Sequence, residues 1–475
     1  MRLKEKKDLL NILDDILNKI EYYGVNYLKE NIDYINQNLN KINVLSNNKI
    51  NAENIDIQKF ESLNIDDEHS IIELINCIEE FNYKLKEYDD IKIEIVFLPY
   101  KVSMWDSFES VYKAAKNDNR CNCSVVPIPY YELGENRKPI KLCYEGSMFP
   151  KDVEITPYEM YNIEELKPDI IYIHNPYDDL NKLTCIDPRY FSDKLCNYTD
   201  MLVYIPYYID GSYINSEEHL HFSSNPGPIN ATKIIAQSEV HRKLFIENGF
   251  SESKVLNLGI PKFDKIIEVC KNEWPIDDEW EEKLENKKVF LLNLTIDDVL
   301  NNVNWGNELI NFIKEFENDN SIGLILRSHP LMEVTLKTMV PEYHDLYERI
   351  INIAKTFENI IIDNTPDTFM AIKKSDALIS GYSSILFQYL ATEKPILSFM
   401  KDDKIDENRE YCLDYLGVYF ENKEVTAKKF IDMVKQGIDY KKEIRMNKFK
   451  NSSTNIDGSC GQKVHEYIKM EVLNK

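Results

Sequence analysis

The sequence lacks several features that would identify a function class at once. Its 475 residues include 14 glycines and 9 cysteines, and no two cysteines form a CxxC pair. The closest pair, Cys121 and Cys123, has no second pair of ligands, which a structural zinc site would need. We therefore expect free thiols in a reducing compartment, and neither a metal ion nor another cofactor.

Membrane-spanning and export signals are also missing. No apolar run approaches the roughly 18 residues that cross a bilayer, and the first 20 residues alternate charges with Leu and Ile at helical spacing, unlike a signal peptide. We expect a cytoplasmic, soluble protein. A peripheral position on the inner face of the cell membrane is the alternative, because lysines are dense from Lys423 onward. A solvated helix face is the simpler interpretation of those lysines.

Positive charge is scarce in the chain as a whole. Acidic residues number 81 against 57 basic ones, which gives a net charge of -24. A nucleic-acid-binding protein would show the opposite balance, so that class is excluded. Hydrophobic residues make up 43% of the chain, and 475 residues exceed what one core holds. Two or three globular domains are expected.

Residues 1–90 differ from the rest of the chain in the spacing of their apolar residues. Leu10, Leu13, Leu17 and Ile20 recur at alternating steps of three and four, and residues 70–88 repeat the pattern. This spacing predicts amphipathic helices, with the Asn-rich segment 43–60 as a loop between them. We predict a helical hairpin or short bundle that serves packing or self-association.

From residue 91 onward, short β-rich runs alternate with helical stretches. Such alternation predicts an α/β fold, with a parallel sheet covered by helices on both faces. The pattern occurs twice, over 91–262 and 287–440, with a polar helical linker at 263–286 and a basic helical tail at 441–475. Ligands of such domains bind beyond the carboxyl ends of the strands, so the loops there are the places to look for chemistry.

Two of these loops, both in the second domain, offer donors for an anion. In "DALISGYSSILF" a strand ends at Ser380 and a helix begins, with Gly381, Ser383 and Ser384 at the junction. Backbone N–H groups and serine hydroxyls at a helix start bind phosphate, although serine is also an ordinary helix cap. In "LILRSHP" the residues Arg327 and His329 follow a strand and can bind phosphate oxygens.

A third stretch, "LGIPKFD" at 258–264, displays Lys262 and Asp264 after a tight turn. Together, R-S-H-P, S-D-A-L-I-S-G-Y-S-S and G-I-P-K-F-D resemble motifs of the CDP-glycerol glycerophosphotransferase family of teichoic acid and capsule polymerases. The resemblance is specific over residues 259–395, looser over 91–249, and absent from 1–90.

The resemblance implies a GT-B fold, in which two Rossmann-like domains face each other and the C-terminal one holds the nucleotide. It implies transfer of glycerol phosphate, or a related alditol phosphate such as ribitol phosphate, from a CDP-activated donor. The acceptor would be a hydroxyl of a cell-surface glycan or lipid-linked precursor, and CMP would be released. Helix-terminal N–H groups with Arg327 and His329 would stabilise the leaving phosphate without a metal ion.

The resemblance also implies roles for individual residues. The donor pyrophosphate would be bound by Arg327, His329, Ser383 and Ser384, beside Gly381 of the same loop, and the nucleotide by Asn364, Thr365 and Asp367. Further residues of the cleft would be Lys262, Asp264, Thr295 and Gln388.

The chain departs from the family pattern at several points. Gly381 stands where the family has an Asp, Gln388 where it has another Asp, and Lys262 where it has an Arg. The Trp-His-Gly motif, whose histidine is the family's expected general base, is absent from the N-terminal half.

A general base must therefore come from other residues of the first domain. We expect His174, oriented by Asp178, or Asp106, ahead of His221, which lies in a polar loop. Each of the first two has a structural alternative: a buried histidine and a helix cap. No DxD-like carboxylate cluster stands on the loops, and the pairs 297–298 and 402–403 are expected to be solvated acids.

Two other functions remain open at this stage. A GT-B glycosyltransferase would use a sugar nucleotide as donor, and fold alone does not exclude it. A catalytically inactive nucleotide-binding scaffold would explain the missing Trp-His-Gly motif, with residues 1–90 recruiting a partner.

Overall fold

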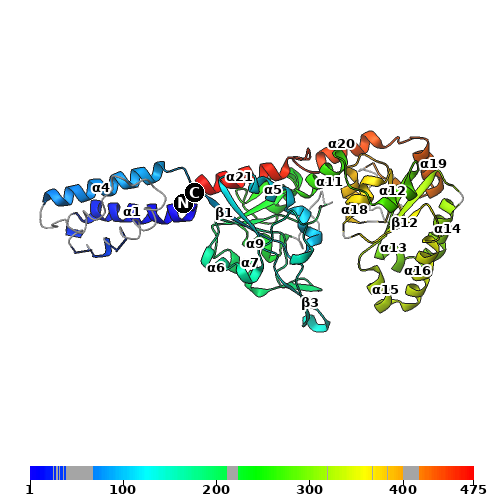
Figure 1. The fold of residues 1–475 in the computed structure, drawn as a ribbon, viewed down its shortest axis with the longest axis horizontal. Helices are drawn as coiled ribbons and strands as arrows, with labels where there is room; N and C mark the ends of the chain where they lie inside the picture. The colour runs from blue at the N-terminus through cyan, green and yellow to red at the C-terminus, as the bar shows by residue number, and fades with distance from the viewer. Residues whose placement is uncertain are drawn as a thin grey trace.

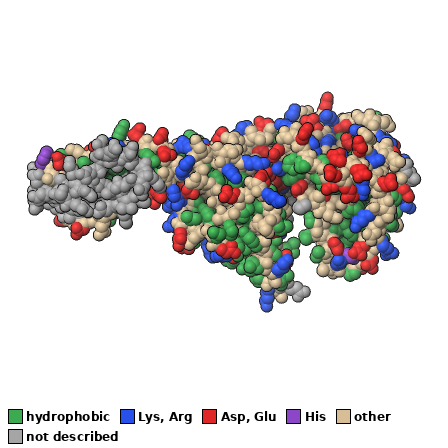
Figure 2. Space-filling view, viewed as in Figure 1, with side chains coloured by type: hydrophobic (Ala, Val, Ile, Leu, Met, Phe, Trp, Pro, Cys, Tyr) green, Lys and Arg blue, Asp and Glu red, His purple; other side chains and the backbone are tan. Residues whose placement is uncertain are grey.

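The computed structural model describes residues 1–24, most of 26–38, 68–210, 223–399 without 318, 366 and 382, and 417–474. Three bodies follow one another along its length: a helical hairpin and two sheet domains (Figure 1). Between the two sheet domains an open cleft is visible in Figure 2. In the described part of the chain no helix combines the length and apolarity needed to cross a membrane.

The N-terminal hairpin pairs α1 (Leu3–Tyr23) with α4 (Glu68–Glu87). Its core consists of apolar side chains spaced at helical intervals on both helices, which are Leu9, Leu13, Ile16, Ile20, Ile71, Leu74, Ile78, Phe81 and Leu85. The predicted helical N-terminal region is therefore present. The hairpin projects away from the sheet domains (Figure 1), and residues 1–3 join it to the first sheet through backbone bonds between Met1, Leu3 and Lys92.

The first sheet domain has six parallel strands in the order β2-β1-β5-β7-β8-β9. These are β1 (Ile93–Leu98), β2 (Cys121–Val125), β5 (Ile170–Ile173), β7 (Met201–Tyr204), β8 (Lys233–Ala236) and β9 (Val255–Asn257). Its helical segments are η1 (Val102–Ser107), α5 (Glu109–Lys116), α6 (Ile163–Leu166), α7 (Ser192–Leu195), α9 (Pro226–Asn230) and α10 (Glu239–Glu247). A three-stranded antiparallel arm adds β3 (Tyr130–Leu133), β4 (Pro139–Cys143) and β6 (Thr184–Ile186). The strand order reverses between β1 and β5.

The second sheet domain also has six parallel strands, in the order β12-β11-β10-β13-β14-β15. They are β10 (Lys288–Leu294), β11 (Ile322–Ser328), β12 (Ile360–Asp363), β13 (Ala377–Ser380), β14 (Ile396–Ser398) and β15 (Tyr419–Phe420). Its helices are α12 (Asp278–Leu284), α13 (Ile296–Leu300), α14 (Trp305–Glu317), α15 (Met332–Met339), α16 (Pro341–Ala354), α17 (Phe369–Lys374), α18 (Ser384–Leu390) and α19 (Ala427–Lys435). The order reverses between β10 and β13, and ligands bind at such a switch point.

Two segments connect the domains. Helix α11 (Lys262–Lys271) lies at their junction, and the chain returns through α20 (Lys442–Ser452) on the second domain and α21 (Cys460–Asn474) on the first (Figure 1). Val464, Ile468 and Val472 of α21 are buried in the same core as strand β1. The segment 441–475 is thus helical, but its last helix is an integral layer of the first domain.

Candidate active site

The strand-end loops of the second domain meet at one edge of the sheet. β10 lies between β11 and β13, with Leu294 paired to Ser328 and Asn293 paired to Ser380. Because adjacent strands are about 4.8 Å apart, the ends of β11 and β13 are separated by roughly 10 Å. The "RSHP" and "SGYSS" loops therefore flank the end of β10, at the switch point where the fold class places its ligands.

His329 is the exposed donor at this edge. Its backbone N–H bonds to the carbonyl of Leu294 (3.0 Å), and its Nδ1 accepts the N–H of Leu331 (3.1 Å). An Nδ1 that accepts leaves the proton on Nε2, which points away from that turn. Partial burial lowers the pKa of His329, so the ring is a neutral hydrogen-bond donor near pH 7.

The start of α18 supplies further donors. The Asn293 side-chain amide donates to Ser380 Oγ (2.9 Å) and Ser383 Oγ (3.1 Å), which fixes both hydroxyls. Ser383 is the first flanking residue of α18 and makes no side-chain capping bond, while Ser384 is exposed. Backbone N–H groups at an uncapped helix start remain available to an acceptor.

The side chain of Asp298 contacts both Gly381 and Thr295, two residues expected at the donor site. Thr295 N–H donates to Asp298 Oδ2 (2.9 Å) and Thr295 Oγ1 accepts the N–H of Asp298 (3.1 Å), which opens α13 with a capping box. The N–H of Gly381 also bonds to the Asp298 carboxylate. The expectation that Asp298 is a plain solvated acid is wrong. The Thr-x-x-Asp spacing at 295–298 was the signal for this cap.

Arg327, which is expected on the donor pyrophosphate, has an acidic partner within the protein. Arg327 is buried, and its Nη1 donates to Asp363 Oδ2 (2.7 Å) and Thr365 Oγ1 (3.2 Å). Asp363 Oδ1 in turn accepts from the N–H and hydroxyl of Thr365 (2.9 and 2.6 Å). Arg327 therefore fixes the loop after β12 and has no uncompensated charge for phosphate. Asn364 and Asp367 of that loop are exposed.

Gln388, expected in the cleft, is buried on the second turn of α18. Its Oε1 accepts a hydrogen bond from the hydroxyl of Thr368 (3.3 Å), so it joins α18 to the start of α17.

His174 lies at the switch point of the first sheet, as expected of a residue after β5, but the structure gives it no catalytic freedom. Its Nε2 accepts the N–H of Tyr100 (3.3 Å), its Nδ1 contacts Ser107 Oγ (3.1 Å), and its ring stacks on Phe108 at 4.6 Å. The side chain is fully buried, which lowers its pKa to about 3. Asp178 does not orient it, since it binds Ser192 through the N–H (2.9 Å) and hydroxyl (2.6 Å) of that residue.

Asp106 lies on η1 at the domain junction, where it pairs with Lys262 of α11. Its Oδ1 has no hydrogen-bond partner among the described residues. Burial raises the pKa of Asp106, and Lys262 opposes that rise. Asp367 of the second domain is close enough to contribute to the same rise. Asp106 is thus a nearly buried carboxylate at the junction of the two sheet domains.

Two predicted residues, Asp264 and His221, are not found in the cleft among the described residues. Asp264 is buried and accepts the N–H groups of Gly461 (2.7 Å) and Cys460 (3.2 Å), so it caps α21 and does not line the cleft. His221 lies outside the described residues.

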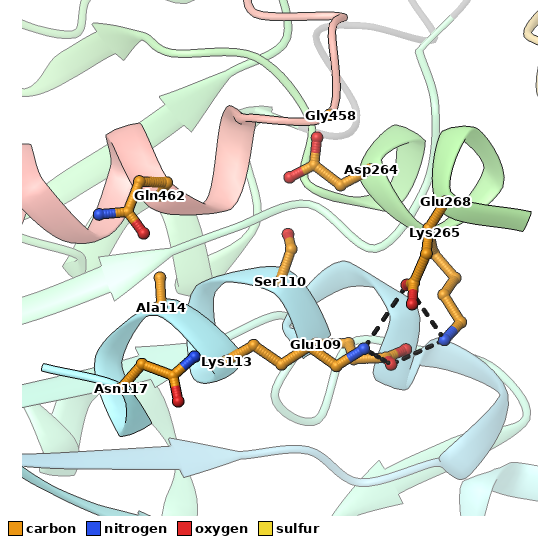
Figure 3. Close-up of a pocket in the computed structure, with 10 residues that line it drawn as sticks. All are labelled: Glu109, Ser110, Lys113, Ala114, Asn117, Asp264, Lys265, Glu268, Gly458 and Gln462. Carbon is orange, nitrogen blue, oxygen red and sulfur yellow. Dashed lines mark hydrogen bonds and ion pairs between the residues drawn. The ribbon is translucent and has the colours of Figure 1, made fainter. Parts of the chain in front are cut away.

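A pocket with a volume of about 300 Å³ lies away from these loops, between α5, α11 and the start of α21. Its lining charges are already paired with one another (Figure 3): Glu109 with Lys113 (2.7 Å) and Lys265 (2.8 Å), and Glu268 with the same two lysines at 3.5 Å. The pocket therefore has little uncompensated charge with which to attract the donor, and we place the chemistry at the strand ends.

Two parallel-sheet domains that face each other across a cleft, with the candidate site at the strand ends of the second, define a GT-B-type fold. A profile of the CDP-Glycerol:Poly(glycerophosphate) glycerophosphotransferase family matches residues 227–469, slightly more than half of the 475-residue chain. The chain belongs to this family and is a glycerophosphotransferase enzyme with CDP-glycerol as donor. The sugar-nucleotide and inactive-scaffold alternatives are not favoured.

Solved structures show the same fold. One structure of the wall teichoic acid polymerase TagF shares 15% identity (TM-score 0.52) and covers 82% of this chain and 93% of its own. Another, soaked with CDPG, shares 17% identity (TM-score 0.51) and covers 82% and 92%. A UDP-GlcNAc 2-epimerase from Neisseria meningitidis shares 12% (TM-score 0.50) and covers 80% and 100%. These likenesses show the fold alone, and a comparison with curated proteins returns no match.

Proposed function

We propose that the diphosphate of CDP-glycerol binds at the carboxyl edge of the second sheet, between His329 and the start of α18. The observation that carries the proposal is the hydrogen bond from the Leu331 N–H to Nδ1 of the exposed His329, from which we infer that Nε2 carries the proton. Ser383 and Ser384 supply hydroxyl and backbone donors on the other side of that strand. Asn364 and Asp367 are exposed on the loop that would face the nucleotide.

This arrangement suits phosphoryl transfer from a diphosphate. The bond from the glycerol-bearing phosphorus to its bridging oxygen breaks, and negative charge develops on the departing CMP phosphate. A neutral imidazole N–H and backbone N–H groups stabilise that charge without needing a proton transfer. Arg327 contributes indirectly, because its pairing with Asp363 holds the loop after β12 in place.

We propose Asp106 as the general base on the acceptor side. Its Oδ1 is buried without a hydrogen-bond partner among the described residues, so a change in the distance between the domains would have to expose it, and the charge of Asp367 of the facing domain acts on it. His174 has both ring nitrogens engaged. The base takes the proton of the attacking hydroxyl as the new P–O bond forms.

The test measures CMP release from CDP-glycerol in the presence of a poly(glycerophosphate) acceptor. His329→Ala is expected to lower kcat about 100-fold, since one preorganised donor contributes on that scale, and His329→Gln to retain part of the activity through its amide N–H. Asp106→Asn should lower kcat with little change in the dissociation constant of CDP-glycerol. The exposed His69 of α4 is the control, and His69→Ala should behave as wild type. Unchanged turnover in His329→Ala contradicts the proposal.

We propose that the acceptor is a hydroxyl of a cell-surface glycan or lipid-linked precursor and that the enzyme works in the cytoplasm at the inner membrane face. Support comes from exposed Lys442 and Lys450 on α20, which suit an anionic surface. Flotation with anionic and neutral vesicles measures this, and equal flotation with both argues against it.

A further inference from the structure

Two helices of the second domain carry a group of metal-ligating side chains. Helices α15 and α16 lie side by side (Figure 1) and are joined at Val340. Glu333 lies in the first turn of α15, and His344 and Glu348 are four residues apart on α16, hence on one face of that helix. Each of the three side chains has a ligand atom within 4.8 Å of the ligand atoms of the other two. The three can therefore reach one cation.

His344 differs from the two glutamates because it is buried. Its side chain is only 9% exposed, and its Nε2 has no hydrogen-bond partner in the part of the chain that the structure describes. This nitrogen lies 3.7 Å from Glu348 Oε1, which is too far for a hydrogen bond. Since a buried polar atom without a partner is costly, Nε2 calls for a ligand from outside the chain.

The spacing of these atoms suits a metal ion between them. Zn²⁺ binds imidazole nitrogen and carboxylate oxygen at about 2.1 Å in tetrahedral geometry, which separates neighbouring ligand atoms by about 3.4 Å. The 3.7 Å from His344 Nε2 to Glu348 Oε1 is close to this value. Asp345 Oδ1 lies 3.9 Å from Nδ1 of the same ring, and a carboxylate there favours a proton on Nδ1. Nε2 then keeps the lone pair that a metal ion needs.

Lys337 competes with a metal ion for this group. Its Nζ lies 2.6 Å from Glu333 Oε1, in an i,i+4 pair whose side chains are 53% and 60% exposed. Exposed pairs of this kind contribute little to stability. A divalent ion held by three ligands can therefore displace the ammonium group.

We propose that Glu333, His344 and Glu348 bind a transition-metal ion of the Zn²⁺ type, which fastens α15 to α16. One imidazole and two carboxylates suit such an ion better than Mg²⁺, which prefers oxygen ligands alone. Three protein ligands leave one position of a tetrahedral site for water. Metal binding here does not depend on the proposed donor site.

The position of the site gives the ion a structural role. Both helices are bonded to the loop that carries His329: the N–H of Met332 in α15 donates to the His329 carbonyl (2.8 Å), and the hydroxyl of Tyr347 in α16 donates to Ser328 Oγ (2.8 Å). An ion that fastens α15 to α16 steadies the two helices that hold this loop.

The first test is calorimetric titration of Zn²⁺, Mn²⁺ and Mg²⁺ into the full chain after treatment with a chelator. Wild type is expected to bind Zn²⁺ more tightly than Mn²⁺, and Mg²⁺ weakest of the three. Glu333→Gln, His344→Gln and Glu348→Gln should each weaken Zn²⁺ binding at least about 10-fold. The two glutamates are exposed, so their variants keep the test valid if buried His344 is needed for folding. Free cysteines also bind Zn²⁺, but equally in every variant.

The chain offers a matched control on another helix. His69 and Glu73 of α4 form the same i,i+4 pair, with Nε2 3.8 Å from Oε1, but His69 is 80% exposed and no third ligand joins them among the described residues. His69→Gln should leave Zn²⁺ binding unchanged, and Lys337→Gln should tighten it by removing the competing cation. Equal losses in His69→Gln and His344→Gln, or unchanged binding in both glutamate variants, overturn the proposal. Mg²⁺ bound as tightly as Zn²⁺ overturns it as well.

Hydrogen exchange with and without Zn²⁺ locates the ion. Amides of α15 and α16 should exchange more slowly with Zn²⁺ in wild type but not in Glu348→Gln. A second group of possible ligands, Asp118, Cys121 and His465, lies in the first domain, where Lys469 also contacts Asp118. Protection confined to that region, with none in α15 and α16, would show that the ion binds elsewhere and overturn the proposal.

Discussion

The imidazole of His174 is uncharged because burial and the nearby charge of Lys262 together lower its pKa, and they outweigh the contact with the Met104 backbone, which raises it. Nε2 accepts a backbone N–H, so it cannot carry a proton, and the Nδ1 proton bonds to Ser107 Oγ, which itself donates to the Met104 carbonyl (2.7 Å). Full burial adds a desolvation cost for the cation. His174 is therefore a structural part of the switch point of the first sheet.

This buried ring predicts an acid-dependent loss of stability. The folded pKa is about 3, whereas an unfolded histidine titrates near 6.5. The unfolded chain thus binds more protons below pH 6.5, and stability falls by roughly 1.4 kcal/mol for each pH unit from there down toward pH 3. His174→Gln should be less stable at pH 7 but lose about 2 kcal/mol less between pH 7 and 5 in urea unfolding. Equal slopes would show that His174 is not the titrating group.

At the same scale, the positions of several strand-end residues were predictable from the sequence, but their hydrogen-bond partners were not. His329 follows an apolar strand and precedes a proline, so its placement at a strand end was predictable. Arg327 has the same strand-end pattern, yet Asp363 from another strand takes its guanidinium. A pairing between residues 36 positions apart depends on the strand order, which local pattern does not give.

At the scale of elements, the two segments that connect the sheet domains, one before α11 and one before α21, pack closely against each other. Thr454, which precedes α21, bonds through its N–H to the Gln237 carbonyl (2.8 Å) and through its hydroxyl to Asn257 Oδ1 (2.5 Å). Gly259, which precedes α11, has φ +94°, and a Cβ there would overlap the Thr454 carbonyl. Only glycine allows both the backbone angle and the close approach.

Gly259→Ala is therefore expected to destabilise the protein more than a positive φ alone explains. Gly249 is a matched control, because its φ is also +94° and no atom lies within 4 Å of its Cβ position. Gly249→Ala should cost about 1 kcal/mol from backbone strain, and Gly259→Ala a further 1–3 kcal/mol or so from overpacking. Thermal unfolding measures both, and equal losses would mean that the Thr454 contact relaxes freely.

At the scale of the whole molecule, the N-terminal and C-terminal ends of the described chain lie close together. Helix α21 runs along the first domain, and both termini lie side by side at the base of the hairpin (Figure 1), where Lys7 Nζ donates to the Val472 carbonyl (2.9 Å). Asp264 caps α21 from the domain junction. The first domain therefore cannot complete its core until the last residues of the chain are in place.

Ile468→Ala tests whether α21 completes the core of the first domain. Ile468 is fully buried and Met470 is 53% exposed on the same helix, so Ile468→Ala should destabilise the first domain by about 2–5 kcal/mol and Met470→Ala by little. Hydrogen exchange localises the effect: amides of β1 should exchange faster in Ile468→Ala, while those of β10 should not. Equal exchange in β1 for both variants would mean that α21 is not part of that core.

The sequence by itself determined the helical N-terminal region, the doubled α/β pattern and the motifs that link the chain to its family, but not the antiparallel arm of β3, β4 and β6. These depend on local spacing of apolar residues and on short motifs, which the chain carries wherever it folds. The tertiary structure alone decided which charges meet. It paired Arg327 with Asp363, buried His174, placed Asp298 on Gly381, and returned α21 to the first domain. Such contacts are set by strand order and by burial, and both arise only when distant segments pack together.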